Sequence, residues 1–341
     1  MSFLPQVSRE VRLAAQPEGL PEARHFTLAE VPMPVPAAGE VLVRNRFFHV
    51  FAALRTLVGG GVRDTPVPPL RPGDPLPGPA VGEVVAAPGG DGGGPRPGDL
   101  VAHWLGWREY AVVPAAQVTP LGDALPDPVA HLGQGAIAYA ALTRDAEVRP
   151  GDTVFVSGAA GAVGSLAGQV ARLLGAGRVI GSTGSPDKAA RLVAELGYDA
   201  AVVRGAGPIG EQLGEAAPDG VDVLLDNVGG DQLRAAVAAA RPGARFVLVG
   251  ALSGQLAAEG RGGTSPVELD TYRLILRRVT LRAFQGLDEE LRAAWLRRYG
   301  GWLRAGEIAF PHVRIAGIEN APRAFQEVIE GRHFGTVVVE P

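Results

Sequence analysis

The stretch Val154–Ser165, VFVSGAAGAVGS, changes abruptly from apolar residues to very small ones. Gly161 and Gly164 carry no Cβ, which lets a phosphate approach the backbone and a helix press against the preceding strand. Exposed N–H groups and the positive end of a helix dipole favour an anion there. Small residues also serve close helix packing without a ligand, so the motif alone leaves both interpretations open. The first predicts a dinucleotide pyrophosphate, held by Ala159, Gly161, Ala162, Val163 and Gly164.

The residues on either side of this turn predict a strand before it and a helix after it. Thr153–Ser157 is β-branched and aromatic, as suits a strand buried on both faces of a parallel sheet. After the turn, apolar residues recur at helical spacing on one side, at Leu166, Val170, Leu173 and Leu174. The predicted unit is therefore strand, tight turn, helix.

The same alternation continues along the chain. Further strands are expected at Arg178–Gly184, Asp199–Arg204, Val221–Gly230, Ala244–Leu252 and Val279–Gly286, with helices between them. Alternation of this kind predicts an α/β fold with a doubly wound parallel sheet of the Rossmann type.

The first part of the chain has a different pattern. Short strands are expected at Glu40–Val50, Gly78–Ala87 and Arg108–Val118, separated by connections rich in Pro and Gly. Turns rather than helices between strands predict a partly open antiparallel β-barrel. The tail is again β-rich, so we expect it to return to this first unit. The predicted domains are residues 1–125 with 310–341 for the substrate and 126–309 for the dinucleotide.

Composition excludes several classes of function. The chain has 341 residues, 46% of them apolar and 20% charged, as in folded globular proteins. Its net charge of -4, without a basic cluster, argues against nucleic acid as the main partner. No apolar stretch approaches the roughly twenty residues of a membrane span, so we expect no membrane association and a cytoplasmic location. The absence of cysteine removes disulfides, thiolate nucleophiles and cysteine-ligated zinc.

Four blocks of the sequence resemble a known enzyme family. They are LGWREYAVV, RPGDTVFVSGAAGAVGSLAGQVARLLG, VIGSTGSPDKAARLVAELGYDAAV and VDVLLDNVGG. In this order and spacing they resemble the zinc-free double-bond reductases of the medium-chain dehydrogenase/reductase superfamily, which include prostaglandin reductases and plant alkenal reductases. The likeness runs over nearly the whole chain. It implies a Rossmann domain, a GroES-like antiparallel barrel and a nicotinamide cofactor.

The zinc ligands of related enzymes are missing. Zinc-dependent relatives carry a cysteine near the position of His49 and a Gly-His-Glu where this chain reads GPAVGE, at residues 78–83. We therefore predict no metal site. His49 is then a lone histidine on a strand, which packs or lines a pocket.

Charge predicts the choice of cofactor. Sites selective for NAD place a carboxylate at the end of the second strand. This chain has Ser182, Thr183 and Gly184 there, so nothing repels a 2′-phosphate. In the resembling family the lysine of this block, here Lys188, contacts that phosphate, and Arg204 is a further partner because guanidinium pairs bidentately with phosphate. The alternative is that both cations are merely solvated. NADPH is the predicted cofactor.

Three more residues are candidate cofactor contacts. In similar proteins the asparagine at Asn227 touches the cofactor, although it can also serve as a turn-forming residue. Gly250 would allow close approach of the nicotinamide ribose. His333 stands where the family has the asparagine of its GKNxGK block.

The resemblance implies hydride transfer from NADPH to the β-carbon of an α,β-unsaturated carbonyl compound, with no zinc required. Two tyrosines of the family's substrate pocket are replaced, by Ala53 and Leu276. Reduction of quinones and non-catalytic binding of NADPH therefore remain alternatives. Tyr272 and His49 are the candidate donors to the substrate carbonyl, whereas Tyr139 is expected to pack in the core. The strand containing VTLRAF is expected to pair across a two-fold axis, which predicts a homodimer.

Overall fold

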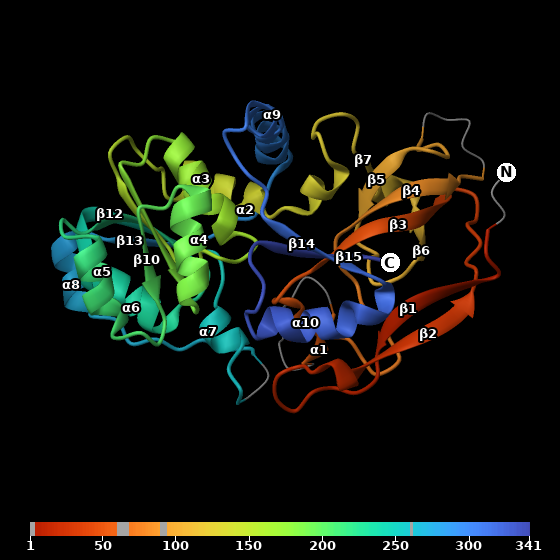
Figure 1. The fold of residues 1–341 in the computed structure, drawn as a ribbon, viewed down its shortest axis with the longest axis horizontal. Coiled ribbons are helices and arrows are strands. Elements are labelled where there is room, and N and C mark those ends of the chain that lie inside the picture. Colours follow the sequence, from red (N-terminus) through yellow and green to blue (C-terminus); the bar gives the residue numbers. More distant parts are fainter. Residues whose placement is uncertain (1–3, 60–67, 89–93, 260–261) are drawn as a thin grey trace.

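The computed structural model describes residues 4–59, 68–88, 94–259 and 262–341. Figure 1 shows two sheet-containing units side by side, with the parallel sheet on the left and the antiparallel sheet on the right. Within the described ranges no helix is both long and apolar enough to cross a membrane.

The parallel sheet has six strands in the order β10-β9-β8-β11-β12-β13, and every neighbouring pair is parallel. The strands are β8 (Thr153–Val156), β9 (Arg178–Thr183), β10 (Ala200–Val203), β11 (Val221–Asp226), β12 (Ala240–Leu248) and β13 (Thr280–Ala283). Chain order runs outward from β8 in one direction and then from β11 in the other. This is the Rossmann arrangement, in which ligands bind at the reversal between β8 and β11. The predicted doubly wound α/β fold is confirmed.

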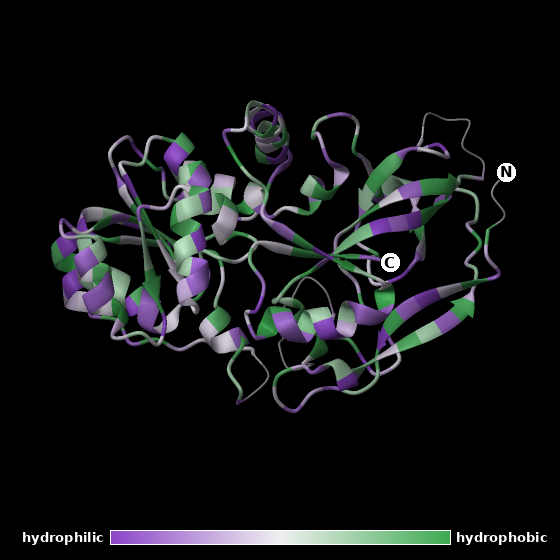
Figure 2. Ribbon diagram, in the orientation of Figure 1, coloured by the Kyte–Doolittle hydropathy of each residue, from purple (hydrophilic) through white to green (hydrophobic). Residues whose placement is uncertain are grey.

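Helices cover both faces of this sheet. They are α2 (Gly135–Ala140), α3 (Gly164–Leu173), α4 (Pro186–Leu196), α5 (Ile209–Ala216), α6 (Gly230–Ala238), α7 (Leu252–Gln255), α8 (Thr271–Arg277) and α9 (Glu289–Ala305). Val154 and Val156 pack into one apolar cluster with residues of α2, α3 and α9. Phe155 points into a second cluster with α5 and α6. Figure 2 shows these helices alternating between apolar and polar residues, as expected for helices with one face on a sheet.

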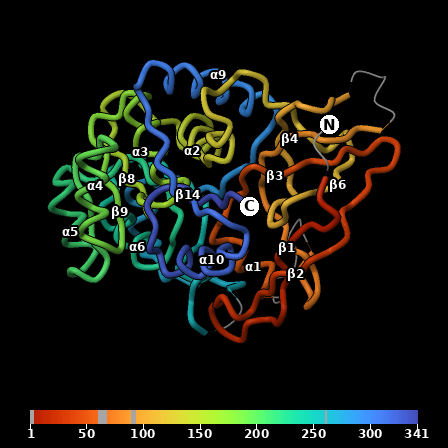
Figure 3. Tube along the Cα trace, turned by 45° about the vertical axis from the view of Figure 1, so that its right-hand side comes forward, coloured from red at the N-terminus to blue at the C-terminus, as the bar shows by residue number. Residues whose placement is uncertain are grey.

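The second sheet has the order β14-β15-β3-β4-β5-β7, and β6 also pairs with β3. Its strands are β3 (Glu40–Val50), β4 (Ala80–Ala86), β5 (Leu100–His103), β6 (Tyr110–Pro114), β7 (Thr119–Pro120), β14 (His312–Ala316) and β15 (Thr336–Glu340). All pairs are antiparallel except β14 with β15. Because β15 pairs with β3, the C-terminus lies beside strands from the first part of the chain (Figure 3).

Four further elements flank this sheet. The strands β1 (Val7–Leu13) and β2 (Phe26–Pro32) form a separate antiparallel pair. The helices α1 (Leu54–Val58) and α10 (Ala321–Ile329) add Leu54 and Phe325, both fully buried, to the same apolar cluster as Phe48 of β3.

Several predicted strand boundaries are wrong, among them the end of β6, which lies at Pro114 instead of Val118. β11 ends at Asp226 instead of Gly230, because Gly229 and Gly230 adopt positive φ angles of 75° and 55° and turn the chain into α6. β12 spans Ala240–Leu248 instead of the predicted Ala244–Leu252, so Pro242 and Gly243 lie inside the strand. The register between β11 and β12 shifts there, which accommodates these two residues in the strand.

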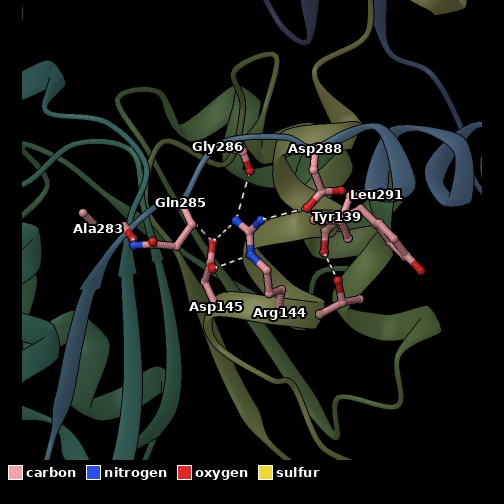
Figure 4. A network of polar contacts seen from close by, with 9 residues as sticks. Tyr139, Arg144, Asp145, Ala283, Gln285, Gly286, Asp288 and Leu291 are labelled. Carbon is pink, nitrogen blue, oxygen red and sulfur yellow. Dashed lines mark hydrogen bonds and ion pairs between the residues drawn. The ribbon is translucent and has the colours of Figure 1, made fainter.

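An ionic network fixes the connection between β13 and α9 (Figure 4). Arg144 donates through two nitrogens to Asp145, at 2.8 and 3.0 Å, and through one to the carbonyl of Gly286 at 3.0 Å. Its guanidinium also lies 3.7 Å from Asp288, whose side chain caps α9. The network ties the residues after α2 to the start of α9, so it supports the helical layer over the parallel sheet.

Candidate active site

The turn after β8 lies at the point where the strand order reverses. Gly158 has a φ of 62°, and its N–H donates to Ser182 Oγ at 3.0 Å. A Cβ added at Gly164 would collide with Gly158 O and lie 2.5 Å from Ala159 Cα. Gly164 is therefore required by the packing of α3 against the turn, as the close-packing interpretation of the motif predicts.

Gly161 behaves differently from Gly164. It is exposed, and a Cβ added to it would meet only Gly158 O, at an ordinary 3.4 Å. The N–H group of Val163 donates to no acceptor among the described residues. Ala162 N–H is directed at Gly335 O in the bridge between Gly161 and Gly335, and Ala159 N–H donates to Ser182 O at 2.8 Å. The turn thus presents one available donor, at Val163, beside a residue that leaves space for an anion.

A buried carboxylate organises the facing end of β11. Asp226 is fully buried and accepts a 2.5 Å hydrogen bond from Ser157 Oγ. It also accepts from the N–H groups of Val228 and Gly229, at 3.0 and 2.9 Å. These bonds offset the cost of burying a charge and hold the chain after β11 in a fixed turn.

Asn227 is held by the same turn. Its N–H donates to Ser157 Oγ at 2.7 Å and its side-chain amide donates to Ser157 O at 2.7 Å. Gly250 packs against it, since an added Cβ there would lie 2.8 Å from Asn227 O. Asn227, Gly250 and the glycine turn are therefore brought together at one edge of the parallel sheet.

Two cations lie near the C-terminal end of β9, Lys188 on α4 and Arg204 directly after β10. Ser182 and Thr183 are buried, and Gly184 is exposed beneath the guanidinium of Arg204, which would lie 2.9 Å from an added Cβ. Lys188 Nζ donates to the carbonyls of Gly331 and His333, the latter at 2.6 Å. Burial lowers the pKa of Lys188, with a smaller contribution from Arg191.

The chain between α10 and β15 crosses the glycine turn. Gly335 N–H donates to Ala160 O at 2.9 Å, and Gly335 forms a parallel bridge with Gly161. The His333 side chain turns back toward α10, where its Nε2 lies 3.0 Å from Glu327. The structure thus places His333 beside the predicted pyrophosphate turn through its backbone.

His49 lies at the end of β3 and is 2% exposed. Burial lowers its pKa to about 4, so the ring is neutral at physiological pH. Its Nδ1 lies 3.3 Å from the side-chain nitrogen of Gln134, which directly precedes α2. Phe51 follows at 5.6 Å between ring centroids, and Trp104, which is 49% exposed, lies 6.0 Å from Phe51. These aromatic rings form a row from His49 to the surface.

Tyr272 does not join this group. It lies on α8 and is 68% exposed. In Figure 1 α8 occupies the outer end of the parallel sheet, at the opposite side of the molecule from β3. Tyr139 is 7% exposed and packs against Trp295, as expected of a core residue.

Comparison with known proteins places the chain in a family. Residues 9–121 match the family described as N-terminal domain of oxidoreductase, and residues 162–297 match the family described as zinc-binding dehydrogenase. The NADPH-dependent curcumin reductase of Escherichia coli (strain K12) is 30% identical over 98% of this chain and 97% of its own length. The chain belongs to the zinc-free branch of the medium-chain dehydrogenase/reductase superfamily. The resemblance seen in the sequence is thereby confirmed.

Two further members of the superfamily extend the comparison. The NADP(+)-dependent 2-alkenal reductase of Nicotiana tabacum is 30% identical over 89% of this chain and 87% of its own. CurA from Vibrio vulnificus, solved in complex with NADPH, matches with a TM-score of 0.86 and 30% identity over 97% of this chain and 98% of its own. Among the residues that the structure describes, no three His, Cys, Asp or Glu side chains gather as a metal site.

Sequence reasoning missed Ser157, Asp226 and Gln134. For Asp226 a signal exists, because a carboxylate at the end of the apolar run VDVLLD must find several donors if the strand is buried. Gln134 gives no such signal. Its contact with His49 joins residues 85 positions apart in the chain, and only the packing of the two units brings them together.

Proposed function

We propose that this chain is an NADPH-dependent reductase that delivers hydride to the β-carbon of an α,β-unsaturated carbonyl compound without a metal ion. The observation that carries this proposal is the edge between β8 and β11, where Val163 presents an available N–H donor beside the exposed Gly161. The names of the curcumin and 2-alkenal reductases support the same reaction.

The residues at this edge fit NADPH. The N–H of Val163 and the open space at Gly161 suit the pyrophosphate, and the cations Lys188 and Arg204 suit the 2′-phosphate at the tip of β9. Ala159, Ser182, Thr183 and Gly184 shape the adenosine side, whereas Asn227 and Gly250 lie toward the nicotinamide side. The backbone carbonyl of His333 accepts from Lys188, so His333 lies at the end that would hold the 2′-phosphate. No carboxylate occupies the end of β9, which favours NADPH over NADH.

The cofactor supplies a hydride when bound. The chain must then hold the acceptor beside it, exclude water and stabilise the negative charge that develops on the substrate carbonyl oxygen. Phe51 and Trp104 offer apolar ring faces for a flat conjugated acceptor. A hydrogen-bond donor near the end of β3 would stabilise the enolate oxygen, and a proton then reaches the α-carbon.

A panel of enones, enals and quinones tests this function. The purified protein is mixed with NADPH and each acceptor, and loss of the reduced nicotinamide is followed by absorbance. We expect oxidation of NADPH with enones or enals, and a saturated carbonyl compound as the product. A hydroquinone from quinones alone would instead favour the quinone reductase alternative, and tight NADPH binding without turnover would favour a binding protein.

We also propose that residues 1–125 with 310–341 form one domain and residues 126–309 the other, and that the protein is located in the cytoplasm.

We propose in addition that the chain forms a homodimer. β13 is the last strand of its sheet, and its residues are exposed. Beside it, Tyr272, Ile275 and Leu276 of α8 are more than 60% exposed, and Leu281 of β13 is 38% exposed. A second copy of β13 would cover this edge and these apolar side chains. Leu281→Asp is expected to give monomers in sedimentation, and an unchanged dimer, or a monomeric parent protein, would contradict this interface.

A further inference from the structure

At the proposed site, His49 of β3 contacts Gln134, the residue that directly precedes α2. Gln134 Nε2 lies 3.2 Å from Leu132 O and 3.3 Å from His49 Nδ1. A carbonyl oxygen can only accept, so the Leu132 contact fixes which end of the Gln134 side chain is the nitrogen. Both N–H groups of the amide then donate, one to Leu132 O and one to His49 Nδ1.

This arrangement determines where the imidazole carries its proton. A nitrogen that accepts a hydrogen bond from an amide cannot itself be protonated, so the neutral ring carries its proton on Nε2. Nε2 lies across the ring from Nδ1 and therefore faces away from Gln134. The tautomer follows from the acceptor at Leu132, not from any charged neighbour.

The N–H at Nε2 is available to a ligand. Within the described ranges His49 makes no side-chain hydrogen bond besides the one with Gln134. Nε2 is also not among the fully enclosed side-chain nitrogens that lack a partner. An acceptor atom of a small molecule can therefore reach it, along the row formed by Phe51 and Trp104.

We propose that Gln134 is a positioning residue that locks His49 as a neutral Nε2–H donor, and that this N–H binds the carbonyl oxygen of the acceptor. The proposal rests on the proposed reductase function. A neutral imidazole donates to a developing enolate without first losing a proton, and it keeps this role across the physiological pH range. Tyr272 is not needed for it.

No charged group competes for this histidine. Burial is the single cause of its lowered pKa, and no ionised side chain of β4, of β15, of the Pro128–Leu132 segment or of α2 contributes. His131 in that segment is itself held neutral by burial, which lowers its pKa. Protonation of His49 at neutral pH would therefore need a new negative partner, and the variant below supplies one.

The tautomer is tested first, independently of turnover. The measurement is an NMR spectrum of protein labelled with ¹⁵N-histidine and saturated with NADP⁺. The signal of His49 is identified as the one that is missing from the spectrum of His49→Gln. We expect a protonated Nε2 and an unprotonated Nδ1 at pH 7. The opposite tautomer, or an imidazolium at this pH, would overturn the proposal.

Gln134→Glu tests the positioning role. A carboxylate of the same shape accepts from Nδ1–H, so the proton should move to Nδ1 or the ring should become charged. We expect kcat with an enone to fall about 100-fold, with a new ionisation in its pH profile, while NADPH affinity is unchanged. Gln117→Glu, an exposed glutamine elsewhere on the same unit, is the charge-matched control and should alter neither.

His49→Leu tests the donor itself. We expect kcat to fall about 100- to 1,000-fold at saturating NADPH, with partial recovery in His49→Gln, which keeps an N–H near the Nε2 position. An unchanged kcat in His49→Leu would overturn the donor role even though the enzyme reduces enones. If the parent protein reduces no acceptor, the reductase function falls and the donor role falls with it, whereas the tautomer assignment is judged by the ¹⁵N spectrum alone.

Discussion

The edge of the parallel sheet and the end of β3 contribute to the same proposed reaction, but the first does so mainly through backbone groups and the second through side chains. At the parallel edge, backbone groups and one buried carboxylate make most of the contacts, as the bonds of Asp226 to Ser157, Val228 and Gly229 show. At the end of β3, the groups proposed to face the acceptor are side chains, namely His49, Phe51 and Trp104, with Gln134 holding His49.

This difference explains how one fold keeps its cofactor while its acceptor changes. A backbone turn is set by the fold, so substitutions of nearby side chains leave its N–H groups in place. A pocket made of side chains changes with each substitution. Ala53, where the resembling family has a substrate-facing tyrosine, follows β3 within three residues, whereas the glycine turn is retained, which is consistent with this division.

The largest effect of a single substitution on stability is expected at Gly164. Gly164→Ala places a Cβ 2.5 Å from Ala159 Cα, which the turn cannot accommodate without moving α3. We expect a loss of at least about 3 kcal/mol in the free energy of unfolding, measured by chemical denaturation. Gly161→Ala is the matched control, because its Cβ has room: it should fold normally and yet bind NADPH more weakly. Equal destabilisation by the two variants would contradict the different roles assigned to these glycines.

Acid should affect the antiparallel side next. Burial lowers the pKa of His49 to about 4, and burial together with Arg108 lowers that of His103 to about 4, against 6.5 for a free histidine. The unfolded chain therefore binds these protons first, so stability is full above pH 6.5 and falls as the pH drops toward 4. The loss is roughly 3 kcal/mol per histidine. Denaturation at pH 7.5, 5.5 and 4.5 measures it.

His103→Gln provides the internal check on this prediction. It removes one of the two titrating groups, so the slope of unfolding free energy against pH between 6.5 and 4 should become shallower. An identical slope in the parent and the variant would show that other groups cause the acid dependence.

A smaller effect is expected at Asp226. Asp226→Asn keeps the shape but replaces one acceptor oxygen with a donor, facing Ser157 Oγ or the N–H of Gly229. We expect about 2 kcal/mol less stability and weaker NADPH binding, with the KM for the acceptor unchanged. Ser157→Ala removes a single bond and should cost less. If Asp226→Asn changed only the KM for the acceptor, Asp226 would act on the acceptor and not on NADPH, which would contradict this prediction.

The smallest effect is expected at the tip of β9. Lys188→Ala and Arg204→Ala should each weaken NADPH about tenfold, near 1.4 kcal/mol, without changing the affinity for NADH. Calorimetry with both nucleotides measures this, and Arg24→Ala, which removes an exposed cation paired with Glu22, is the control. Equal losses for NADPH and NADH would exclude a contact with the 2′-phosphate.

The sequence predicts the parallel side of the molecule better than the antiparallel side of the site. The alternation of strands and helices along the chain and the turn at Gly161 follow from local patterns, because apolar periodicity and missing side chains act within a few residues. The strand ends at Asp226 and Ala240 do not, since the φ angles of Gly229 and Gly230 and the register of β12 depend on neighbours in space.

Contacts between distant segments account for the rest. The bond between His49 and Gln134 and the bonds from Lys188 to the tail join residues 85 and more than 140 positions apart. No periodicity within either segment encodes such a pairing. Tyr272 shows the converse, because the sequence makes it a candidate donor to the substrate, whereas α8 carries it to the outer end of the sheet.

The most direct test of the account uses NADPH carrying deuterium at C4 of the nicotinamide and a simple enone in a single turnover. Mass spectrometry and NMR of the product locate the label. We expect a saturated ketone with deuterium at the β-carbon. Deuterium at the former carbonyl carbon of an alcohol, or no transfer at all from a protein that binds NADPH, would contradict the account.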